Sequence, residues 1–272
     1  MIIDNAKINR NELRGKVAVV TGSGRGIGRE TARVLAYLGA SVVIAELRKT
    51  GLDTEILIKK EGGGEALFVK TDVSDVEDME NLYRKSIEKF GKVDILVNNA
   101  AMTGPVKPVL ELSVEEWDGF FAVNLRGAFL GIKNFLPDML KRKEGIIIIF
   151  LSAEGLSYVA PYSASKTGLR SLTKSIALEI AADSGVSIYS YAPGIVETPG
   201  LIDSFKKLSN YYGTTLEVFV KMLGVPFISA ELCATGLVGT ILHAKEFHGK
   251  ETNFFEGLTK LGLDGQGNRI SE

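Results

Sequence analysis

Short apolar runs alternate with longer segments of helical spacing from about residue 16 to residue 191. Strands that are buried on both faces read as continuous apolar runs, and they alternate with helices where the sheet is parallel. The pattern therefore predicts an α/β fold, a doubly wound parallel sheet with helices on both faces. The expected strands cover 16–20, 41–45, 66–69, 93–97, 146–151 and 186–191, and the expected helices cover 27–38, 53–60, 75–90, 113–139 and 162–182.

The alternation continues without a linker rich in proline or serine and without an internal repeat. A chain of 272 residues has the length of one large α/β domain. We therefore expect a single domain over residues 1–272, in which the alternation stops at about 198–228.

The chain has a formal net charge of −1, and 45% of its residues are hydrophobic. This near-neutral balance gives no electrostatic footprint for nucleic acid, and no apolar run has the length of a membrane span. The polar first 16 residues lack the apolar core of a signal peptide. We expect a cytoplasmic protein with no nucleic-acid or membrane partner.

Cys233 is the only cysteine, so no disulfide bond can form within the chain. Together with His243 and His248 it makes a sparse set of metal-ligating residue types. Neither the spacing of these residues nor their carboxylate support fits a zinc site, and we expect no bound metal.

A glycine-rich loop follows the first expected strand and opens the first expected helix. Backbone N–H groups at such a helix start can approach the pyrophosphate of a dinucleotide, because glycines leave no Cβ in the way. The spacing is G-x-x-x-G-x-G rather than G-x-G-x-x-G, and a plain glycine turn is the alternative. The candidate cofactor-binding residues of this loop are Gly22, Gly24, Arg25, Gly26, Ile27 and Gly28.

Glu46 stands at the end of the second expected strand. In a dinucleotide-binding fold, an acidic residue here accepts hydrogen bonds from the adenosine ribose and repels a 2′-phosphate, which favours NAD. Arg25 and Arg48 favour NADP, because a guanidinium can pair with that phosphate. Since either arginine can equally be solvated, we expect NAD, with NADP as the alternative.

Tyr162 and Lys166 stand four residues apart near the start of an expected helix. Side chains at i and i+4 share one face of a helix, and an ammonium beside a phenol favours the phenolate and lowers its pKa. The spacing alone leaves two interpretations open, an acid–base pair or two surface residues.

Six motifs, in this order, resemble those of the short-chain dehydrogenase/reductase family over about residues 12–200. They are Thr21-Gly22-x-x-x-Gly26-x-Gly28, Asp72-Val73, Asn98-Asn99-Ala100-Ala101, Val123-Asn124-Leu125, Tyr162-x-x-x-Lys166 and Pro193-Gly194-Ile195-Val196-Glu197-Thr198. The ordered set is specific, although no single member is. The resemblance implies a Rossmann-type dehydrogenase, with further cofactor-binding residues Asp72, Val73, Asn99, Ala100, Tyr162, Lys166, Pro193, Gly194, Ile195 and Thr198.

The resemblance also implies a mechanism. Tyr162 would pass a proton to or from the substrate oxygen, and Lys166 would lower the pKa of that tyrosine and bind the nicotinamide ribose. Asn124 would hold a water molecule on the proton path to solvent. Thr198 and the backbone of Ile195 would fix the nicotinamide end of the cofactor.

The family's polarising serine most often stands thirteen residues before the tyrosine, where this chain has Ile149. Ser152 keeps the family's local context at the end of the fifth strand, so we expect it to be the fourth catalytic residue in a shortened loop. Ser157 is the rival, although a serine there more readily bonds to the backbone. Glu154 and Tyr158 either enter the pocket or belong to a solvated loop.

The C-terminal part departs from the resemblance. We expect a last strand over 252–255, followed by a polar tail over 264–272 at the surface or in a subunit contact. The segment 198–228 is expected to form a lid over the substrate cleft. This segment is rich in apolar and aromatic residues, namely Leu201, Phe205, Leu208, Tyr211, Tyr212, Phe219, Met222, Leu223 and Phe227. They favour a medium-sized apolar or cyclic substrate. The alternative is that they only pack the lid against the rest of the domain.

The expected function is transfer of a hydride between a nicotinamide cofactor and a small secondary alcohol or ketone. The alternatives are a dinucleotide-binding regulatory protein without catalysis, and an enzyme that uses the same site for epimerisation or dehydration. Helices 113–139 and 162–182 are apolar on more than one face, and the family resemblance implies assembly, so we expect a homodimer or homotetramer.

Overall fold

Seven parallel strands form one sheet in the computed structural model, which describes residues 1–152, 156–181, 183–224 and 226–270. The strand order is β3-β2-β1-β4-β5-β6-β7, so the chain changes direction across the sheet between β1 and β4. This order confirms the expected doubly wound parallel sheet. The strands are β1 (Val17–Thr21), β2 (Ser41–Glu46), β3 (Ala66–Lys70), β4 (Ile95–Asn98), β5 (Gly145–Phe150), β6 (Val186–Ala192) and β7 (Glu251–Asn253).

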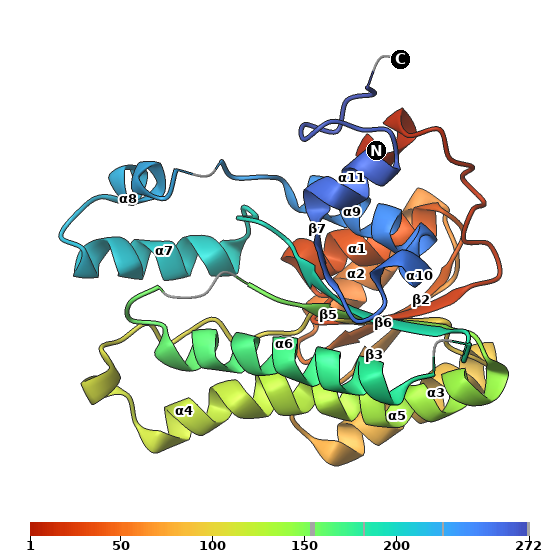
Figure 1. The fold of residues 1–272 in the computed structure, drawn as a ribbon, viewed down its shortest axis with the longest axis horizontal. Helices are drawn as coiled ribbons and strands as arrows, with labels where there is room; N and C mark the ends of the chain where they lie inside the picture. The colour runs from red at the N-terminus through yellow and green to blue at the C-terminus, as the bar shows by residue number, and fades with distance from the viewer. Residues whose placement is uncertain (153–155, 182, 225, 271–272) are drawn as a thin grey trace.

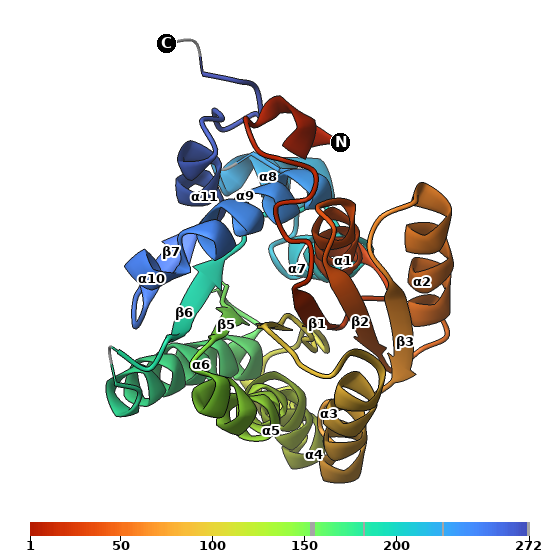
Figure 2. The same cartoon turned by 90° about the vertical axis from the view of Figure 1, so that its right-hand side faces the viewer.

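Helices cover both faces of the sheet, as Figures 1 and 2 show. One face carries α1 (Gly26–Tyr37), α2 (Thr50–Glu61), α9 (Ala230–Leu242), α10 (Ala244–Phe247) and α11 (Phe254–Lys260). The opposite face carries α3 (Val76–Phe90), α4 (Val114–Phe120), α5 (Gly127–Arg142) and α6 (Ala160–Glu179). Two helices, α7 (Pro199–Tyr211) and α8 (Leu216–Met222), project beyond one end of the sheet, and the short turns are η1 (Ile2–Asn5), η2 (Val109–Glu111) and η3 (Phe121–Arg126).

The central strands are apolar along their whole length because both of their faces are covered. In β1, Ala18 and Val20 face one hydrophobic core, while Val17 and Val19 face the other. The first core lies under α1 and α9, and the second lies under α3, α5 and α6. The register of β1 against its neighbours places Val19 between Val43 and Leu96 in the middle of the sheet.

Local capping signals set several helix boundaries. The Asp75 side chain accepts a hydrogen bond from the Asp78 N–H and begins α3, and Gly91, in the left-handed region at φ 77°, ends it. Ser113 and Glu116 form a capping box at the start of α4. The single helix expected over 113–139 is continuous in direction, but the π-helical turn η3 divides it into α4 and α5.

The expected last strand, 252–255, is wrong at its end. β7 stops at Asn253, because the Asn253 side chain accepts a hydrogen bond from the Glu256 N–H and caps α11. The tail beyond Leu263 is largely exposed, as expected, and it returns to the start of the chain, where the Asn5 side chain donates to the Gly267 carbonyl at 2.8 Å.

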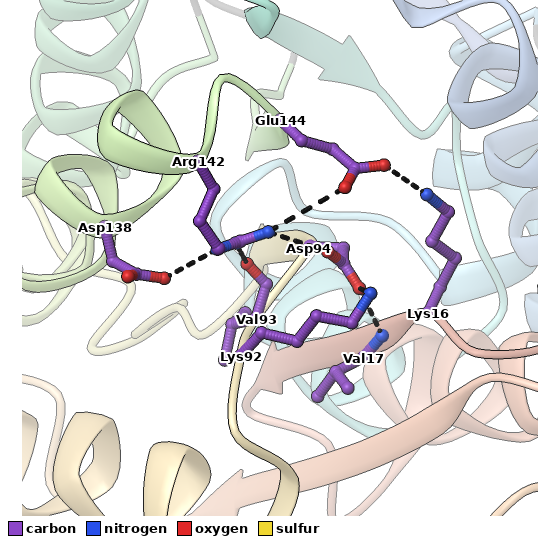
Figure 3. A network of polar contacts seen from close by, with 8 residues as sticks. All are labelled: Lys16, Val17, Lys92, Val93, Asp94, Asp138, Arg142 and Glu144. Carbon is purple, nitrogen blue, oxygen red and sulfur yellow. Dashed lines mark hydrogen bonds and ion pairs between the residues drawn. The ribbon is translucent and has the colours of Figure 1, made fainter.

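A charged network closes the end of the sheet where β1 and β4 begin (Figure 3). Buried Asp94 accepts hydrogen bonds from the Val17 N–H at 2.9 Å and pairs with Lys92 and Arg142, each at 3.0 Å. Arg142 also pairs with Asp138 at 2.8 Å. These contacts join β1, β4 and α5 at the amino ends of the strands, and the candidate site lies at the opposite, carboxyl ends.

Candidate functional site

A cleft of about 350 Å³ opens at the carboxyl ends of β1 and β4, where the order of the strands reverses. Ligands of open α/β sheets bind at this kind of position. Of the candidate residues from the sequence, the cleft is lined by Gly22, Arg25, Gly26, Ile27, Gly28, Glu46, Asp72, Val73, Asn99, Ala100, Ser152, Tyr162, Lys166, Pro193, Gly194 and Thr198. Gly24, Asn124 and Ile195 are not part of this lining.

The glycine loop lies so close to its neighbours that side chains do not fit. A Cβ at Gly28 would lie 2.3 Å from the Gly22 carbonyl oxygen, and one at Gly22 would lie 2.8 Å from the Cα of Ala100. Gly24 has no room for a side chain either, because a Cβ there would lie 2.7 Å from the Cγ of Glu46. The loop is therefore more than a plain turn, since its glycines let backbone approach backbone at the start of α1.

Asn99 fixes this loop from the end of β4. Its Nδ2 donates to the Thr21 carbonyl at 2.7 Å and to the Gly22 carbonyl at 3.2 Å. The Thr21 hydroxyl in turn accepts hydrogen bonds from the N–H groups of Asn99 and Ala100, both at 3.0 Å. Asn99 and Ala100 thus join β1 to β4 beneath the cleft, and both Nδ2 hydrogens of Asn99 are engaged on the loop.

Glu46 connects the end of β2 to the glycine loop. Its carboxylate accepts hydrogen bonds from the Gly24 N–H at 3.0 Å and from the Arg48 N–H at 3.1 Å. These bonds hold the carboxylate at the edge of the cleft, with acceptor positions left on both oxygens. A Cβ at Gly200 would lie 3.8 Å from the Arg25 guanidinium, so this guanidinium reaches towards the start of α7.

Asp72 and Val73 lie beyond β3 at the same end of the cleft. The Asp72 carboxylate accepts hydrogen bonds from the N–H and the hydroxyl of Ser74, at 2.9 and 2.6 Å. Val73 is buried against Gly127, where a Cβ would lie 3.0 Å from a Val73 methyl group. This local turn holds the Asp72 side chain, and Asp72 and Glu46 both line the cleft.

Tyr162 and Ser152 meet at the inner end of the cleft, where the Ser152 hydroxyl is within hydrogen-bonding reach of the phenol. Burial raises the pKa of Tyr162, and the hydrogen bond with Ser152 opposes this rise. The expectation that Lys166 lowers this pKa is wrong in direction, because burial raises it, and the phenol keeps its proton at neutral pH. Ser157 is exposed and is not among the lining residues, while Glu154 lies outside the described residues.

Lys166 is buried one turn along α6 from Tyr162. Its Nζ donates to the Phe150 carbonyl at 2.8 Å and lies 5.9 Å from the centre of the Tyr162 ring. Burial lowers the pKa of Lys166 to about 8. An ammonium has three N–H donors, so those not used on Phe150 can serve a ligand in the cleft.

Asn124 is buried in the π-helical turn η3, behind Tyr162. Its Oδ1 accepts from the Met102 N–H at 2.7 Å, and its Nδ2 donates to the Met102 carbonyl at 3.1 Å and to the Ser165 hydroxyl at 3.0 Å. Ser165 donates to the Tyr162 carbonyl at 2.8 Å. Asn124 thus braces the first turn of α6, and its side chain already has three protein partners.

The segment after β6 closes the cleft on the side of α7. Gly194 adopts φ 78°, and a Cβ there would lie 2.9 Å from the Phe254 ring. The Thr198 hydroxyl caps α7, and its methyl group lies 3.1 Å from where a Gly26 Cβ would be. Ile195 packs away from the lining, with its carbonyl accepting from the Ile228 N–H at 2.9 Å.

These residues fit a dinucleotide. The first N–H groups of α1, from Gly26 on, have no acceptor within the helix. Glu46 offers a carboxylate at the end of β2, and Lys166 offers N–H donors beside Tyr162. Several other lining residues lie outside the motifs singled out from the sequence, namely Ala45, Leu47, Thr71, Thr103, Leu151, Pro199 and Gly200. Leu47, Thr71 and Leu151 directly follow a strand, and this position is the signal that would have found them.

The remaining candidate groups lie elsewhere. Burial raises the pKa of the Cys233 thiol to about 12, so this thiol stays protonated. Among the residues that the structure describes, no three His, Cys, Asp or Glu side chains are placed to hold a metal ion. In the same part of the chain, the helices lack the length and apolarity that crossing a membrane requires.

Residues 16–208 match the family model described as short chain dehydrogenase. An uncharacterized oxidoreductase of Thermotoga maritima is 42% identical over 190 residues, covering 68% of this chain and 73% of that protein. Cyclohexanol dehydrogenase of an Acinetobacter species is 35% identical over 204 residues, covering 74% and 80% of the two chains. The crystal structure of levodione reductase matches at TM-score 0.81 and 27% identity, over 91% of this chain and 98% of that chain.

Proposed function

This chain belongs to the short-chain dehydrogenase family and is an oxidoreductase, and from this premise we propose that it interconverts a secondary alcohol and its ketone with NAD. The observation that carries the proposal is the meeting of Ser152, Tyr162 and Lys166 at the inner end of a cleft lined by the glycine loop. A protein that only senses a dinucleotide needs the loop and Glu46, but it does not need a buried phenol and ammonium beside them.

Tyr162 is the proposed acid–base group at the substrate oxygen. Its pKa is raised by burial, so at neutral pH it can donate its proton from Oη to a ketone oxygen during reduction. Without substrate, the Ser152 hydroxyl donates to the phenol oxygen, the direction that lowers the pKa of Tyr162. With substrate bound, Ser152 would instead donate to the substrate oxygen. Lys166, held by the Phe150 carbonyl, directs its remaining N–H donors towards the ribose.

A bound nicotinamide supplies the hydride acceptor for oxidation or the hydride donor for reduction. The chain's own residues orient it. The backbone of the glycine loop binds the pyrophosphate at the start of α1, Asp72 and Val73 border the adenine, and Pro193, Gly194 and Thr198 border the nicotinamide end. Asn99 and Asn124 act through the loop and α6, because the partners of their side chains are protein atoms.

NAD is proposed over NADP. The Glu46 carboxylate is fixed by two backbone N–H groups at the end of β2, where a 2′-phosphate would bring a second negative charge beside it. Arg25, which stands in the glycine loop, extends towards Gly200 and the start of α7. Arg48 is exposed, and only its backbone N–H bonds to Glu46.

The proposed substrate is a small apolar or alicyclic alcohol or ketone. Tyr162 packs against a hydrophobic cluster of α7, α8 and the loop before α6, whose buried members are Val106, Val159, Phe205, Leu208 and Phe219. An uncharged ring suits this apolar wall beside the phenol. The likeness to cyclohexanol dehydrogenase supports the same substrate class.

A homo-oligomer is also proposed. Trp117 and Phe129 expose 37% and 43% of their surfaces on α4 and α5, and Trp117 stacks on Phe121 at 5.0 Å. A shallow groove between these helices and α6 is lined by Leu125, Phe129 and Leu172. An apolar face of this kind suits a second copy of the chain.

Oxidation of cyclohexanol and of a panel of other alicyclic and open-chain secondary alcohols with NAD or NADP tests the proposal. The absorbance of the reduced cofactor reports turnover. We expect turnover with NAD for at least the alicyclic alcohols. Tight NADH binding without turnover of any alcohol or ketone would favour a dinucleotide sensor instead.

A further inference from the structure

Three tyrosine rings join the loop before α6 to the far end of α7. Tyr158 stacks on Tyr211 with ring centroids 4.5 Å apart and planes at 17°, and it meets Tyr212 edge-on at 5.9 Å and 89°. We call these three rings the tyrosine clamp. Tyr212 also contacts Phe219 of α8 at 5.4 Å, so the clamp continues into the apolar cluster beside Tyr162.

The backbone of Tyr158 is held in an unfavourable conformation. Its φ is 65°, in the left-handed region, where a residue with a Cβ is disfavoured. Such a conformation persists only when the surroundings determine it. The surroundings here are the Tyr211 ring and a hydrogen bond from the Lys107 N–H to the Tyr158 carbonyl at 2.9 Å, and Lys107 is anchored by a 2.5 Å ion pair with Glu116 of α4.

The clamp sits at one end of a helix whose other end lines the cleft. At its start, α7 carries Gly200 and Leu201 in the cleft wall, and the capping residue Thr198 lies against Gly26 of the glycine loop. At its end, α7 carries Tyr211 on the Tyr158 ring. A helix of this length is about 20 Å long and rigid, so it connects the glycine loop to the chain just before Tyr162.

We propose that Tyr158 is a positioning residue, whose ring, docked on Tyr211, sets the backbone that enters α6 and thereby keeps Tyr162 in reach of Ser152. This inference rests on the proposed roles of Ser152 and Tyr162. It adds that the position of α7 and the geometry of the Ser152–Tyr162 pair are coupled through the tyrosine clamp. The clamp consists of residues outside the catalytic set, and its rings pack against each other rather than line the cleft.

Single replacements on the two sides of the stack test the coupling. Tyr158→Leu and Tyr211→Leu each remove one ring, and Tyr158→Phe keeps the ring without its hydroxyl. Tyr83→Leu is the matched control, because Tyr83 is also half-buried and pairs edge-on with Phe135 at 5.4 Å, between α3 and α5. It removes an equivalent ring pair away from the cleft.

Hydrogen exchange of the full chain measures the coupling without a substrate. We expect Tyr211→Leu to speed exchange of the Lys107 N–H and of the Ser163 N–H, which bonds to the Val159 carbonyl at 3.0 Å, by about tenfold. Tyr158→Phe should leave both rates unchanged, and Tyr83→Leu should affect only its own neighbourhood. Unchanged rates at both amides in Tyr211→Leu would overturn the proposal.

Kinetics with cyclohexanol and NAD then separate positioning from simple loss of stability. We expect kcat to fall about tenfold in Tyr158→Leu and in Tyr211→Leu, with the Kd of NADH within twofold of the wild type. Because both variants break the same interaction, kcat of the double variant should fall no further than kcat of either single variant. Tyr158→Phe keeps the ring and should have the kcat of the wild type.

The outcomes distinguish this inference from the proposed function. If Tyr162→Phe is inactive but Tyr158→Leu and Tyr211→Leu match the Tyr83→Leu control, the function stands and the coupling is wrong. If Tyr162→Phe itself retains turnover, the proposed function is wrong, and the exchange rates at Lys107 and Ser163 still decide whether α7 and the loop are coupled.

Discussion

The Lys166 ammonium donates to the main-chain carbonyl of Phe150 at 2.8 Å, and so it joins α6 to the end of β5. Phe150 stands two residues before Ser152, so the same bond links the strand end that carries the serine to the helix that carries Tyr162. The position of the acid–base pair therefore depends on a buried cation, and this dependence can be measured.

Replacement of Lys166 by methionine should change how stability depends on pH. Burial lowers the pKa of Lys166 to about 8, whereas a lysine in an unfolded chain has a pKa of about 10.4. Between these values the unfolded chain binds more protons, so wild-type stability rises with pH in this window relative to the variant. Below pH 8 the full destabilisation is present, and it corresponds to about 3 kcal/mol.

Urea unfolding of both proteins at pH 7, 9 and 10.5 measures this difference. At pH 7 we expect the free energy of unfolding of Lys166→Met to exceed that of the wild type. The difference is up to about 3 kcal/mol, reduced by the contribution of the lost hydrogen bond to Phe150, and it should shrink as the pH rises. Parallel curves for the two proteins would mean that Lys166 titrates normally in the folded chain.

Replacement of Glu46 by glutamine should alter cofactor choice. The carboxylate charge is lost, while an amide of the same shape can still accept from the Gly24 N–H. We expect NADH to bind about tenfold more weakly, in the range for a lost charge-assisted hydrogen bond, and NADPH to bind more tightly. Dissociation constants measured by cofactor fluorescence test this, with the exposed Glu80→Gln as control. Tighter binding of NADPH than of NADH by the wild type would contradict the NAD assignment.

Replacement of Ser152 by alanine should reduce turnover much more than replacement of Ser157. Ser152 lines the cleft and bonds to Tyr162, whereas Ser157 is exposed. We expect a loss of about a hundredfold in kcat for Ser152→Ala and less than about twofold for Ser157→Ala. The reverse order would assign the polarising hydroxyl to Ser157.

Replacement of Phe129 by glutamate should dissociate the proposed oligomer. The ring is 43% exposed on α5 beside the groove with α6, and a buried unpaired carboxylate in an interface is costly. Light scattering should detect an oligomer for the wild type at micromolar concentration and a monomer for the variant. Val76→Glu, at an equally exposed apolar residue of α3, should leave the oligomer intact. A monomeric wild type would refute the proposal.

The sequence predicted the features that depend on local pattern. The strand runs, the glycine loop and the spacing of Tyr162 and Lys166 each follow from residues close together in the chain. The doubly wound parallel sheet also follows, because alternating strands and helices permit few arrangements, whereas the order of its strands is known from the structure. The sheet of the structure tests the strand runs directly, and the family match covers the residues of these motifs.

Other features depend on contacts between distant residues. The bond from the Glu256 N–H to Asn253 is local, but α11, which this bond begins, packs against α9, and that contact joins segments distant in the chain. The use of both Asn99 hydrogens on the Thr21 and Gly22 carbonyls follows from the adjacency of β1 and β4. The pKa of Tyr162 shifts in the direction opposite to the expected one, because burial, which the sequence does not reveal, raises it more than the hydrogen bond with Ser152 lowers it.

The measurement that tests the central claim most directly is turnover by Tyr162→Phe, which removes the hydroxyl and keeps the ring within the apolar cluster. With cyclohexanol and NAD, or with whichever alcohol of the panel the wild type oxidises fastest, we predict a fall in kcat of at least about a hundredfold, as expected for loss of a general acid–base group. The Kd of NADH should stay within about twofold of the wild type, because the hydroxyl faces the substrate oxygen. Near-normal turnover by Tyr162→Phe would contradict the account and leave Tyr162 and Lys166 as packing residues of α6.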